Sequence, residues 1–504
     1  MLRKVEALPE FKVACKSAQD ANCKSALLSG PYDARKEGHS NIISLGVIGL
    51  SHLIDQAKEW IRRCNEEIES IPRRQLDDER LKEKHTLLFP AFPGCPVAFE
   101  KTLVIERRFV QTVSLSEISL LDPRNKFAYI VGLLALLEAK LDALLQAGDR
   151  KPEVVLILLT EEMYETCHVV GDYHRKLRKL KPSDELQLNL FKDFDEFVPP
   201  GQGMIATSGY RILRSALKKI AMSSKRQVPI QIIRERTLLG NETQNLATRS
   251  WNLCTGLYYK TGTLPWVVGG LDSKTCFLGI SFFHKKTAYK DVVYSSMAHL
   301  FSNDFDSIVL RGEPVAFDEI LKAPVLDRAK ARRLVERALE KYETHRHVLP
   351  HRIVFHKTSQ YTDEEISGFR EALDHLRKPF DLVSVTKAPL RLVRWGQYPV
   401  PRGCFLEASP VEAFLYTKGF VPDLQTYPGS HIPSPFWVRK AYGDSSMRII
   451  CAEILALTKL NWNTADYCCG VPITIGFARG VGEVFKEFDD SDAEEPSDLY
   501  RFYM

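Results

Sequence analysis

The sequence predicts an α/β protein built around a parallel sheet, on three observations. The run VVLILL at residues 154–159 is apolar throughout, as is typical of a strand buried on both faces. It follows a helical pattern at residues 126–146. Two later strand candidates, MIATS at 204–208 and PIQII at 229–233, enclose YRILRSALKKIAM, whose apolar spacing is helical. Strand, helix and strand in this order indicate parallel pairing.

A second α/β block is expected after Trp266. FLGISFF and RIVFHKT are strand candidates, whereas DEEISGFREALDHL and SSMRIICAEILALTKL have helical spacing. These four segments lie at residues 277–283, 352–358, 363–376 and 445–460. The acidic stretch KEFDDSDAEEPSD near the end is expected to be solvated.

The residues before about position 95 have a different pattern from the α/β blocks. The turn-rich GPYD at 30–33 and the apolar IISLGVIGL at 42–50 precede a helical stretch near 54–71 and a charged, proline-containing linker. A length of 504 residues also favours more than one domain. We therefore divide the chain into an N-terminal segment and linker (1–95), a second domain (96–265) and a third domain (266–504).

The composition is that of a globular protein. Hydrophobic residues make up 44% and charged residues 26%, so extended disorder is not expected. The net charge of +5 permits an anionic partner without demanding one. Eleven cysteines, an odd number with no C-x-x-C pair, indicate reduced thiols. MLRKVEALPEF does not resemble a signal peptide, so we expect a soluble, cytoplasmic protein without membrane association.

The stretch from GYRILR to LYYK contains donors suited to a terminal phosphate. Tyr210 and Arg214 are four residues apart on the expected helix, so they share a face. Gln231 lies within the next strand, and Asn252 and Lys260 lie in WNLCTGLYYK. Several donors from different elements can converge on a phosphate, the cationic ones at shorter distance, and a tyrosine ring can stack on a base. On chemistry alone, a solvated helix face beside a core amide is the simpler interpretation.

The order Y-x-x-x-R, VPIQII and NLCTGLYYK resembles the MID domain of Argonautes. TQNLATRSWNLCTGLYYKTGTLPW also resembles the MID-to-PIWI junction of short prokaryotic Argonautes. In that family a tyrosine, a basic residue one helical turn later, a glutamine and a lysine cradle the 5′ end of a guide strand. The resemblance assigns these roles to Tyr210, Arg214, Gln231 and Lys260, with Asn252 as a further member. The basic residue is more often lysine in the family, and Lys218 on the next turn is an alternative to Arg214.

The resemblance covers nearly the whole chain, because GPYD and SLGVIG near the start also resemble short Argonautes. It implies a Rossmann-like MID domain at 96–265 and an RNase H-like PIWI domain at 266–504. The residues before Cys95 are too few for the N and PAZ domains of long Argonautes. Argonautes often bind Mg²⁺ beside the guide phosphate through their C-terminal carboxylate, which here belongs to Met504. The resemblance therefore implies magnesium as a cofactor at that place.

The positions that hold catalytic metals in active PIWI domains are occupied here by other residues. PIWI nucleases cut with two divalent ions held by carboxylates. In the family the first aspartate follows an apolar–Gly–apolar motif, and the second follows His-Arg. The corresponding positions here are Ser281 after LGI and Thr358 after HK, and a later ligand position after FA holds Arg479. Neutral hydroxyls and a guanidinium cannot hold two divalent cations, so we expect no catalytic metal pair and no slicing.

The resemblance implies a guide-binding subunit of a defence system. The expected partners are a short guide RNA (or DNA) and a complementary single-stranded DNA target. A third is an APAZ-containing effector that carries a TIR domain, a sirtuin-like NADase or a nuclease, with TIR-APAZ favoured and a higher oligomer expected on activation. Two alternatives stay open. One is a guided endonuclease with displaced carboxylates, and the other is a Rossmann-like small-molecule enzyme, although no G-x-G-x-x-G follows a strand.

Three further stretches have open interpretations. HRKLRKLK at residues 174–181 is either a solvated face or a contact to a nucleic-acid backbone. Arg391, Arg394 and Trp395 mix basic and aromatic side chains, which suits either nucleic-acid contact or packing at the rim of a core. LTKLNWN at 457–463 resembles the late PIWI helix and turn that lie near the guide phosphate.

Overall fold

The computed structural model describes most of the chain, and its contacts divide the chain into two units. The described residues are 3–4, 11–13, 16–18, 23–34, 40–70, 89–167, 206–240, 244–269, 271–272, 274–286, 291–301, 307–318, 323–392, 400–422, 427, 432–488 and 495–504. One unit, called here the parallel-sheet unit, comprises Asp33–Pro265, Glu487–Pro496 and Met504. The other, called the mixed-sheet unit, comprises Met1–Tyr32, Trp266–Lys486 and Ser497–Tyr503.

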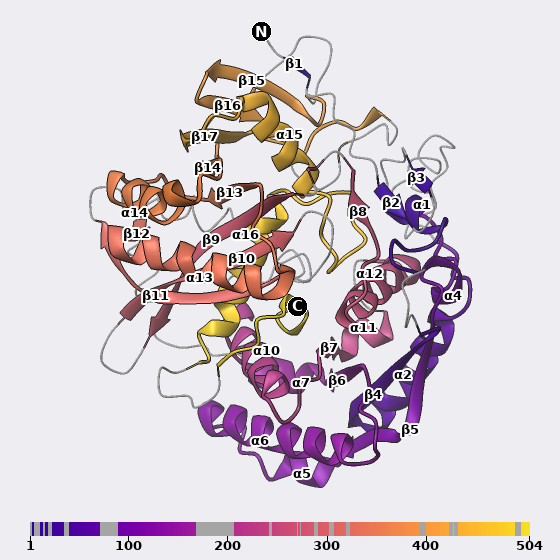
Figure 1. Ribbon diagram of the computed structural model, residues 1–504. Helices are drawn as coiled ribbons and strands as arrows, with labels where there is room; N and C mark the ends of the chain where they lie inside the picture. The colour runs from indigo at the N-terminus through magenta and orange to yellow at the C-terminus, as the bar shows by residue number, and fades with distance from the viewer. Residues whose placement is uncertain are drawn as a thin grey trace. The chain divides into compact units, whose positions relative to one another are not determined.

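The parallel-sheet unit is built on a four-stranded sheet in which every pairing is parallel (Figure 1). Its strand order is β5-β4-β6-β7. The strands are β4 (Ile42–Leu50), β5 (Thr102–Val113), β6 (Val154–Leu159) and β7 (Ile230–Arg234). Every residue of β6 is buried, because this strand has neighbours on both sides and helices over its faces.

Helices pack on this sheet from both sides. α6 (Lys126–Leu145) and α10 (Ala206–Met222) share one hydrophobic core with it, in which Leu133, Leu217 and Ile157 are buried. α2 (Ser51–Cys64) packs on β4 and β5. Its Trp60 donates from Nε1 to Ser250 Oγ of α12 (Leu246–Lys260) at 3.1 Å. The shorter helices are α4 (Cys95–Ala98), α5 (Leu115–Ser119), α7 (Glu161–Thr166) and α11 (Glu235–Leu239).

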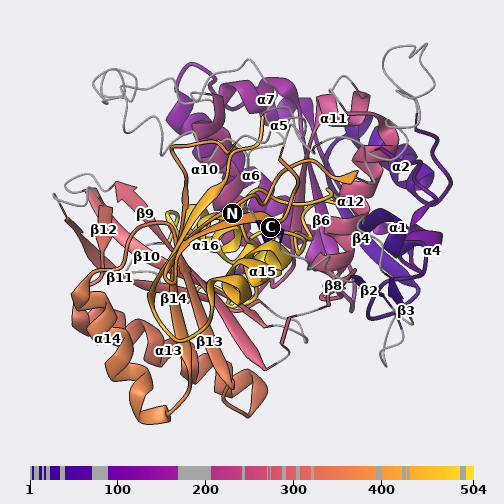
Figure 2. The ribbon, with the colours of Figure 1, turned by 90° about the horizontal axis from the view of Figure 1, so that it is seen from above.

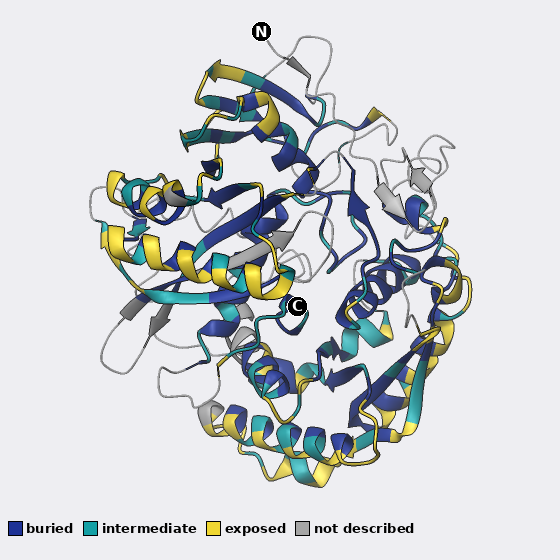
Figure 3. Cartoon of the chain, viewed as in Figure 1, coloured by how far each residue is buried: buried dark blue, intermediate teal, exposed yellow. Residues whose placement is uncertain are grey.

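Several helices of this unit begin at a capping side chain. Asn125, Thr160 and Asn245 precede α6, α7 and α12, and each accepts a hydrogen bond from a backbone N–H of the first turn. Such a cap satisfies one of the N–H groups that a helix start leaves free. Along α6, buried, intermediate and exposed positions follow one another, because one face of the helix packs on the sheet (Figure 3).

The mixed-sheet unit contains a ten-stranded sheet in the order β1-β15-β16-β17-β14-β13-β9-β10-β11-β12. β13 pairs in parallel with β9 and β14, and the other pairings are antiparallel. The strands are β1 (Arg3–Lys4), β9 (Thr275–Lys286), β10 (Asp291–Phe301), β11 (Val309–Asp318), β12 (Ala323–Val325), β13 (Arg352–Lys357), β14 (Phe380–Lys387), β15 (Cys404–Ser409), β16 (Glu412–Leu415) and β17 (Phe436–Tyr442). A small antiparallel sheet in the order β3-β2-β8 joins β2 (Phe11–Val13), β3 (Lys16–Ala18) and β8 (Val267–Val268).

Helices also cover both faces of the large sheet. α13 (Arg328–Arg346) and α14 (Asp363–Leu373) share a core with the side chains of β9 and β13 on one face, and α16 (Ile473–Phe485) contacts β9 and β10 from the other (Figure 2). The remaining helical segments are α1 (Cys23–Leu27), α15 (Met447–Leu457), η2 (Asp374–Leu376) and η4 (Tyr500–Phe502). No helix within the described part of the chain is long and apolar enough to cross a membrane.

Most of the expected elements are confirmed. VVLILL is β6 and PIQII overlaps β7, and the strands and helices expected after Trp266 overlap β9, β13, α14 and α15. The strand expected at 204–208 is wrong, because residues 206–208 begin α10. A short apolar run does not distinguish a strand from a helix start, and β7 takes its place directly beside β6. β4 and α2 fall within the predicted N-terminal segment 1–95, and in the structure they are parts of the parallel-sheet unit.

β9 and α16 meet at Gly279 with no room for a side chain. A Cβ atom added there would overlap the backbone carbonyl of Thr474 and would lie 3.0 Å from the backbone N of Ile475. Because both obstacles are backbone atoms, no change of rotamer relieves the overlap. Gly279 therefore sets how closely the helix approaches the sheet.

We expect Gly279→Ala to destabilise the protein by about 1–3 kcal/mol, the usual cost of overpacking a well-packed core. The measurement is the unfolding midpoint in differential scanning fluorimetry. Gly480→Ala in α16 is the matched control, because its added Cβ meets nothing closer than Tyr500 Oη at 3.8 Å. The control should be neutral or stabilising, since alanine is favoured over glycine within a helix. Equal midpoints for the two variants would contradict the packing argument.

Candidate nucleic-acid interface

Lys260 and Gln231, two of the residues expected at a phosphate site, are in direct contact within the parallel-sheet unit. Lys260 is the last residue of α12, and Gln231 is the second residue of β7. Lys260 Nζ donates to Gln231 Oε1 at 2.5 Å, and Gln231 Nε2 donates to the carbonyl of Ile232 at 3.2 Å. Lys260 is only 3% exposed. The structure thus brings together a lysine and a glutamine that are 29 residues apart in the sequence.

Two further cations act on this lysine from α10. Arg214 and Lys218 are one turn apart on that helix; Lys218 is buried and Arg214 is exposed. Burial and, as a smaller effect, the charge of Arg214 together lower the pKa of Lys260 to about 7. Burial, then the charges of Arg214 and Lys260, hold the pKa of Lys218 well below its usual value. Three like charges near one another, two of them buried, are unfavourable in water-poor surroundings and would be stabilised by an anion.

The other members of the expected phosphate set are placed less completely. Tyr210 lies in α10, but its side chain falls outside the described residues. Asn252 is buried in α12, eight residues before Lys260. Met504, whose carboxylate is the expected magnesium ligand, is buried and belongs to the parallel-sheet unit. Lys218, the alternative to Arg214, lies one turn after it on the same helix, α10.

The positions of the expected nuclease pocket lie on neighbouring elements of the mixed-sheet unit. Ser281 is on β9 and pairs with Ser296 of β10. Lys357, the residue before Thr358, pairs in parallel with Ile280, the residue before Ser281. Continuing this register places Thr358 beside Ser281 on adjacent strands. Arg479 lies in α16, which contacts both β9 and β13.

The charged side chains around these positions are either cationic or paired with an opposite charge. Burial lowers the pKa of Arg479 to about 10, which leaves the guanidinium charged at neutral pH. Lys357 Nζ donates to Glu365 Oε1 at 2.5 Å, and both side chains are buried. Glu365 also accepts from the backbone N of Thr362 in a capping box at the start of α14. Within the described residues, no group of three or more His, Cys, Asp or Glu side chains is arranged to hold a metal ion.

His356, next to Lys357 on β13, is fully buried between β9 and α16. Its ring stacks on Phe277 with centroids 6.2 Å apart, and its Nδ1 lies 2.9 Å from Thr474 Oγ1. Burial lowers the pKa of His356 to about 3, with a smaller effect of Arg352. The imidazole is therefore neutral at physiological pH and packs as a core residue.

Of the stretches with open interpretations, residues 174–181 and Arg394 with Trp395 lie outside the described residues. LTKLNWN is described. Trp266 Nε1 donates to the carbonyl of Lys459, and Trp462 Nε1 donates to the carbonyl of Trp266. These two buried indoles fix the backbone of the turn that follows α15.

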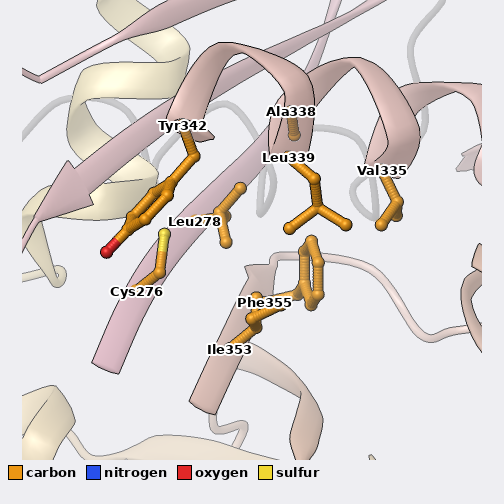
Figure 4. A pocket seen from close by; sticks show the side chains of 8 residues that line it. All are labelled: Cys276, Leu278, Val335, Ala338, Leu339, Tyr342, Ile353 and Phe355. Carbon is orange, nitrogen blue, oxygen red and sulfur yellow. The ribbon is translucent and has the colours of Figure 1, made fainter. Parts of the chain in front are cut away.

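A small cavity lies under α13 in the mixed-sheet unit (Figure 4). Its lining consists of Cys276, Leu278, Val335, Ala338, Leu339, Tyr342, Ile353 and Phe355. The surroundings are apolar, and burial raises the pKa of the Cys276 thiol, so the thiol is protonated at neutral pH. This cavity has no group that would orient a polar ligand, and we treat it as a packing gap of the core.

About half of the sequence is similar to part of a known protein. The protein argonaute of Aquifex aeolicus (strain VF5) is 23% identical over 276 residues, which are 53% of this chain and 36% of that protein. The chain is homologous to Argonaute proteins. No protein-family model matches the sequence.

Solved Argonaute and Piwi structures share the fold over almost the whole chain. Clostridium butyricum Argonaute, bound to a guide DNA and a 19-mer target DNA, superposes with a TM-score of 0.62 at 14% identity, covering 99% of this chain and 54% of that one. A. aeolicus Argonaute with externally bound siRNA superposes with a TM-score of 0.57 at 17% identity, covering 99% of this chain and 56% of that one. Drosophila Piwi superposes with a TM-score of 0.57 at 12% identity, covering 100% of this chain and 56% of that one.

The fold is thus the α/β arrangement of Argonaute MID and PIWI domains, as the sequence predicted. The parallel sheet is the Rossmann-like part, and the ten-stranded mixed sheet is the RNase H-like part. The chain spans about half the length of the Argonaute structures it matches and about a third of the A. aeolicus protein.

We expect the ligand-free protein to gain stability as the pH rises from about 7 to about 10, in part through Lys260. Its folded-state pKa of about 7 is below the value of roughly 10.4 in an unfolded chain. Between these two values the unfolded chain binds more protons, so unfolding becomes harder as pH rises, by at most about 1.4 kcal/mol per pH unit for this group.

The measurement compares urea unfolding of the wild type and Lys260→Met at pH 7, 8 and 9. The wild type should gain stability relative to the variant at each step. A pH-independent difference between the two would mean that the ammonium is not held in an unfavourable setting.

Proposed function

We propose that the chain holds the 5′-terminal phosphate of a short guide strand at the site that comprises Lys260, Gln231, Arg214 and Lys218, called below the phosphate pocket. The observation that carries the proposal is that two buried lysines, Lys218 and Lys260, and the exposed Arg214 lie near enough to affect one another's charge, with Lys260 bonded to Gln231. A phosphate monoester brings a charge of about −1.5 to −2 at pH 7, which offsets the mutual repulsion of these cations. Charge-assisted bonds to Lys260 and Arg214 would then be the short, strong contacts of the site.

The remaining expected members complete this pocket in the proposal. Tyr210, one turn before Arg214 on α10, would stack on the first base, a contact of about 1–3 kcal/mol in single-strand binders. Asn252 on α12 would contribute an amide.

We propose that magnesium binds at this site through oxygen donors. Mg²⁺ prefers oxygen ligands, and the candidates are Gln231 Oε1 and the terminal carboxylate of Met504, both in the parallel-sheet unit. When bound, the ion would neutralise phosphate charge that the lysines do not reach. Met504 would thereby fix the ion, and Lys260 would exchange its contact to Gln231 Oε1 for a phosphate oxygen.

We propose further that the protein does not cut the target itself. Ser281 on β9 and Thr358, the residue after β13, offer neutral hydroxyls, and the buried guanidinium of Arg479 on α16 would repel divalent ions. The nearby carboxylate of Glu365 is engaged by Lys357 and by the helix cap. Recognition of a target would then have to be reported by another protein.

The proposed partners follow from the proposal that this chain binds guide and target while another protein carries the effector activity. The guide is a short RNA, or DNA, and the target is complementary single-stranded DNA, with sequence read by base pairing and backbone held by the protein. Support for nucleic-acid partners comes from the Clostridium butyricum Argonaute structure, which contains a guide DNA and a target DNA. We propose an APAZ-containing effector as the protein partner, with a TIR domain, a sirtuin-like NADase or a nuclease, in a defence complex that oligomerises on activation.

The test of the pocket is the ratio of affinities for the same 20-mer with a 5′-phosphate and with a 5′-hydroxyl, measured by fluorescence anisotropy with Mg²⁺ present. We expect a preference of at least tenfold for the phosphate. Lys260→Ala and Gln231→Ala should reduce it about tenfold and severalfold, since a lost hydrogen bond to a charged group costs about 1.5–3 kcal/mol.

Lys219→Ala is the matched control. Lys219 follows Lys218 on α10, but its Nζ donates to the backbone carbonyl of Glu487 at 2.8 Å. This variant removes a lysine from the same helix and should leave the phosphate preference unchanged. A wild-type ratio near one, or equal effects of Lys219→Ala and Lys260→Ala, would refute the pocket assignment.

A second experiment tests the proposed lack of slicing. The purified chain, loaded with a guide, is incubated with a labelled complementary DNA and Mg²⁺ or Mn²⁺, and we expect the target to remain intact. Adding an APAZ-containing effector should start NAD⁺ consumption or nuclease activity only when guide and target are both present. Guide-directed cleavage by the chain alone would instead support the alternative of a guided endonuclease with displaced carboxylates.

A further inference from the structure

The buried carboxylate of Asp33 joins two segments at the end of the helix that carries Lys260. Asp33 is the last residue of GPYD and is 4% exposed. Its Oδ1 accepts from Tyr258 Oη at 2.6 Å, and its Oδ2 accepts from the backbone N of Leu264 at 2.6 Å. Each carboxylate oxygen therefore has its own donor, more than 200 residues away in the sequence.

Both donors belong to the last turn of α12 or to the segment that leaves it. Tyr258 lies two residues before Lys260. Its carbonyl accepts from Thr261 Oγ1 at 2.7 Å and from Thr263 Oγ1 at 2.6 Å. Between these threonines, Gly262 has a φ of +85°, a left-handed conformation that suits glycine. The chain thus ends the helix in one defined turn, and Asp33 holds that turn from both sides of Lys260.

The charges around Tyr258 support this arrangement. Burial, followed by the charge of Asp33, raises the pKa of Tyr258, so the phenol stays protonated and serves as a donor. Lys101 is buried, and its Nζ lies 5.5 Å from the centroid of the Tyr258 ring. Burial lowers the pKa of Lys101, and the charges of Glu153 and Asp33 oppose this shift. An ionised carboxylate is costly to bury, and here it is compensated by two hydrogen bonds and a nearby ammonium.

We propose that Asp33 is a positioning residue for the phosphate site, an inference that rests on the proposed function. Through Tyr258 and Leu264 it fixes the end of α12 and so sets where Lys260 Nζ lies relative to Gln231. The contact of 2.5 Å between Lys260 and Gln231 leaves little tolerance for a shift of the helix end. The GPYD turn, far from this site in the sequence, is part of its support.

The experiment measures the 5′-phosphate to 5′-hydroxyl affinity ratio, defined above, for Asp33→Ala, Asp33→Asn and Tyr258→Phe. Asp33→Ala removes both acceptors and should lower the ratio about tenfold, with affinity for the 5′-hydroxyl strand within about twofold of wild type. Asp33→Asn keeps an acceptor for the Leu264 N–H, and Tyr258→Phe keeps that bond entirely. Both should lower the ratio less, by about threefold.

The control variant is Asp142→Asn, which removes the charge of another aspartate of the parallel-sheet unit. Asp142 pairs with Arg226 at 2.5 Å, and its loss should leave the ratio unchanged even if the unfolding midpoint falls. A merely structural Asp33 would lower the midpoint and both affinities together, leaving the ratio constant, and that result would overturn the inference. If Asp33→Ala does not fold, the Asn and Phe variants decide, and an unchanged ratio in both refutes it.

The outcomes separate this inference from the proposed function. A wild-type ratio near one removes the phosphate site, and the positioning role falls with it. A high wild-type ratio that all three variants retain leaves the phosphate site standing and overturns only the role of Asp33.

Discussion

The main physical constraint on the parallel-sheet unit is that two of its lysine side chains are buried, where water does not easily reach them. Lys218 and Lys260 are each at most 4% exposed, and Arg214 acts on both. A protein selected for stability alone would replace such lysines with apolar residues of similar size, because a buried like-charged group raises the free energy of the folded state. The residues that carry this free-energy cost lie at the end of α12 and on α10, and Lys260 also contacts Gln231 on β7.

Buried polar and charged side chains are arranged differently in the mixed-sheet unit. There the positions that correspond to metal ligands hold the hydroxyls of Ser281 and Thr358 and the guanidinium of Arg479, and the neighbouring His356 and Lys357 are a neutral imidazole and a lysine joined to Glu365. Lys357 and Glu365 cancel each other's charge inside the core, and His356 stays neutral because burial opposes its protonation. Buried basic residues thus lie near one another in the parallel-sheet unit, whereas the buried Lys357 of the mixed-sheet unit is paired with Glu365.

The sequence allowed the fold class and most strands and helices to be predicted, because buried parallel strands such as β6 have unbroken apolar runs. The contact of Gln231 with Lys260 was predictable only through family resemblance, since neither residue type is diagnostic alone. The strand at 204–208 failed because a five-residue apolar run carries no period. The partnership of Asp33 with Tyr258 and Leu264 was not predictable, because no spacing rule links positions more than 200 residues apart.

The central place of β4 has a consequence for how the protein can be divided. β4 lies between β5 and β6 in the sheet, yet it precedes both in the chain, and its partner β6 is synthesised about a hundred residues later. A fragment starting at residue 96 would lack this strand, and β5 and β6 would each present an unpaired edge. Truncation at that point should yield an aggregating polypeptide, whereas a cut after Tyr32 would keep the parallel sheet whole.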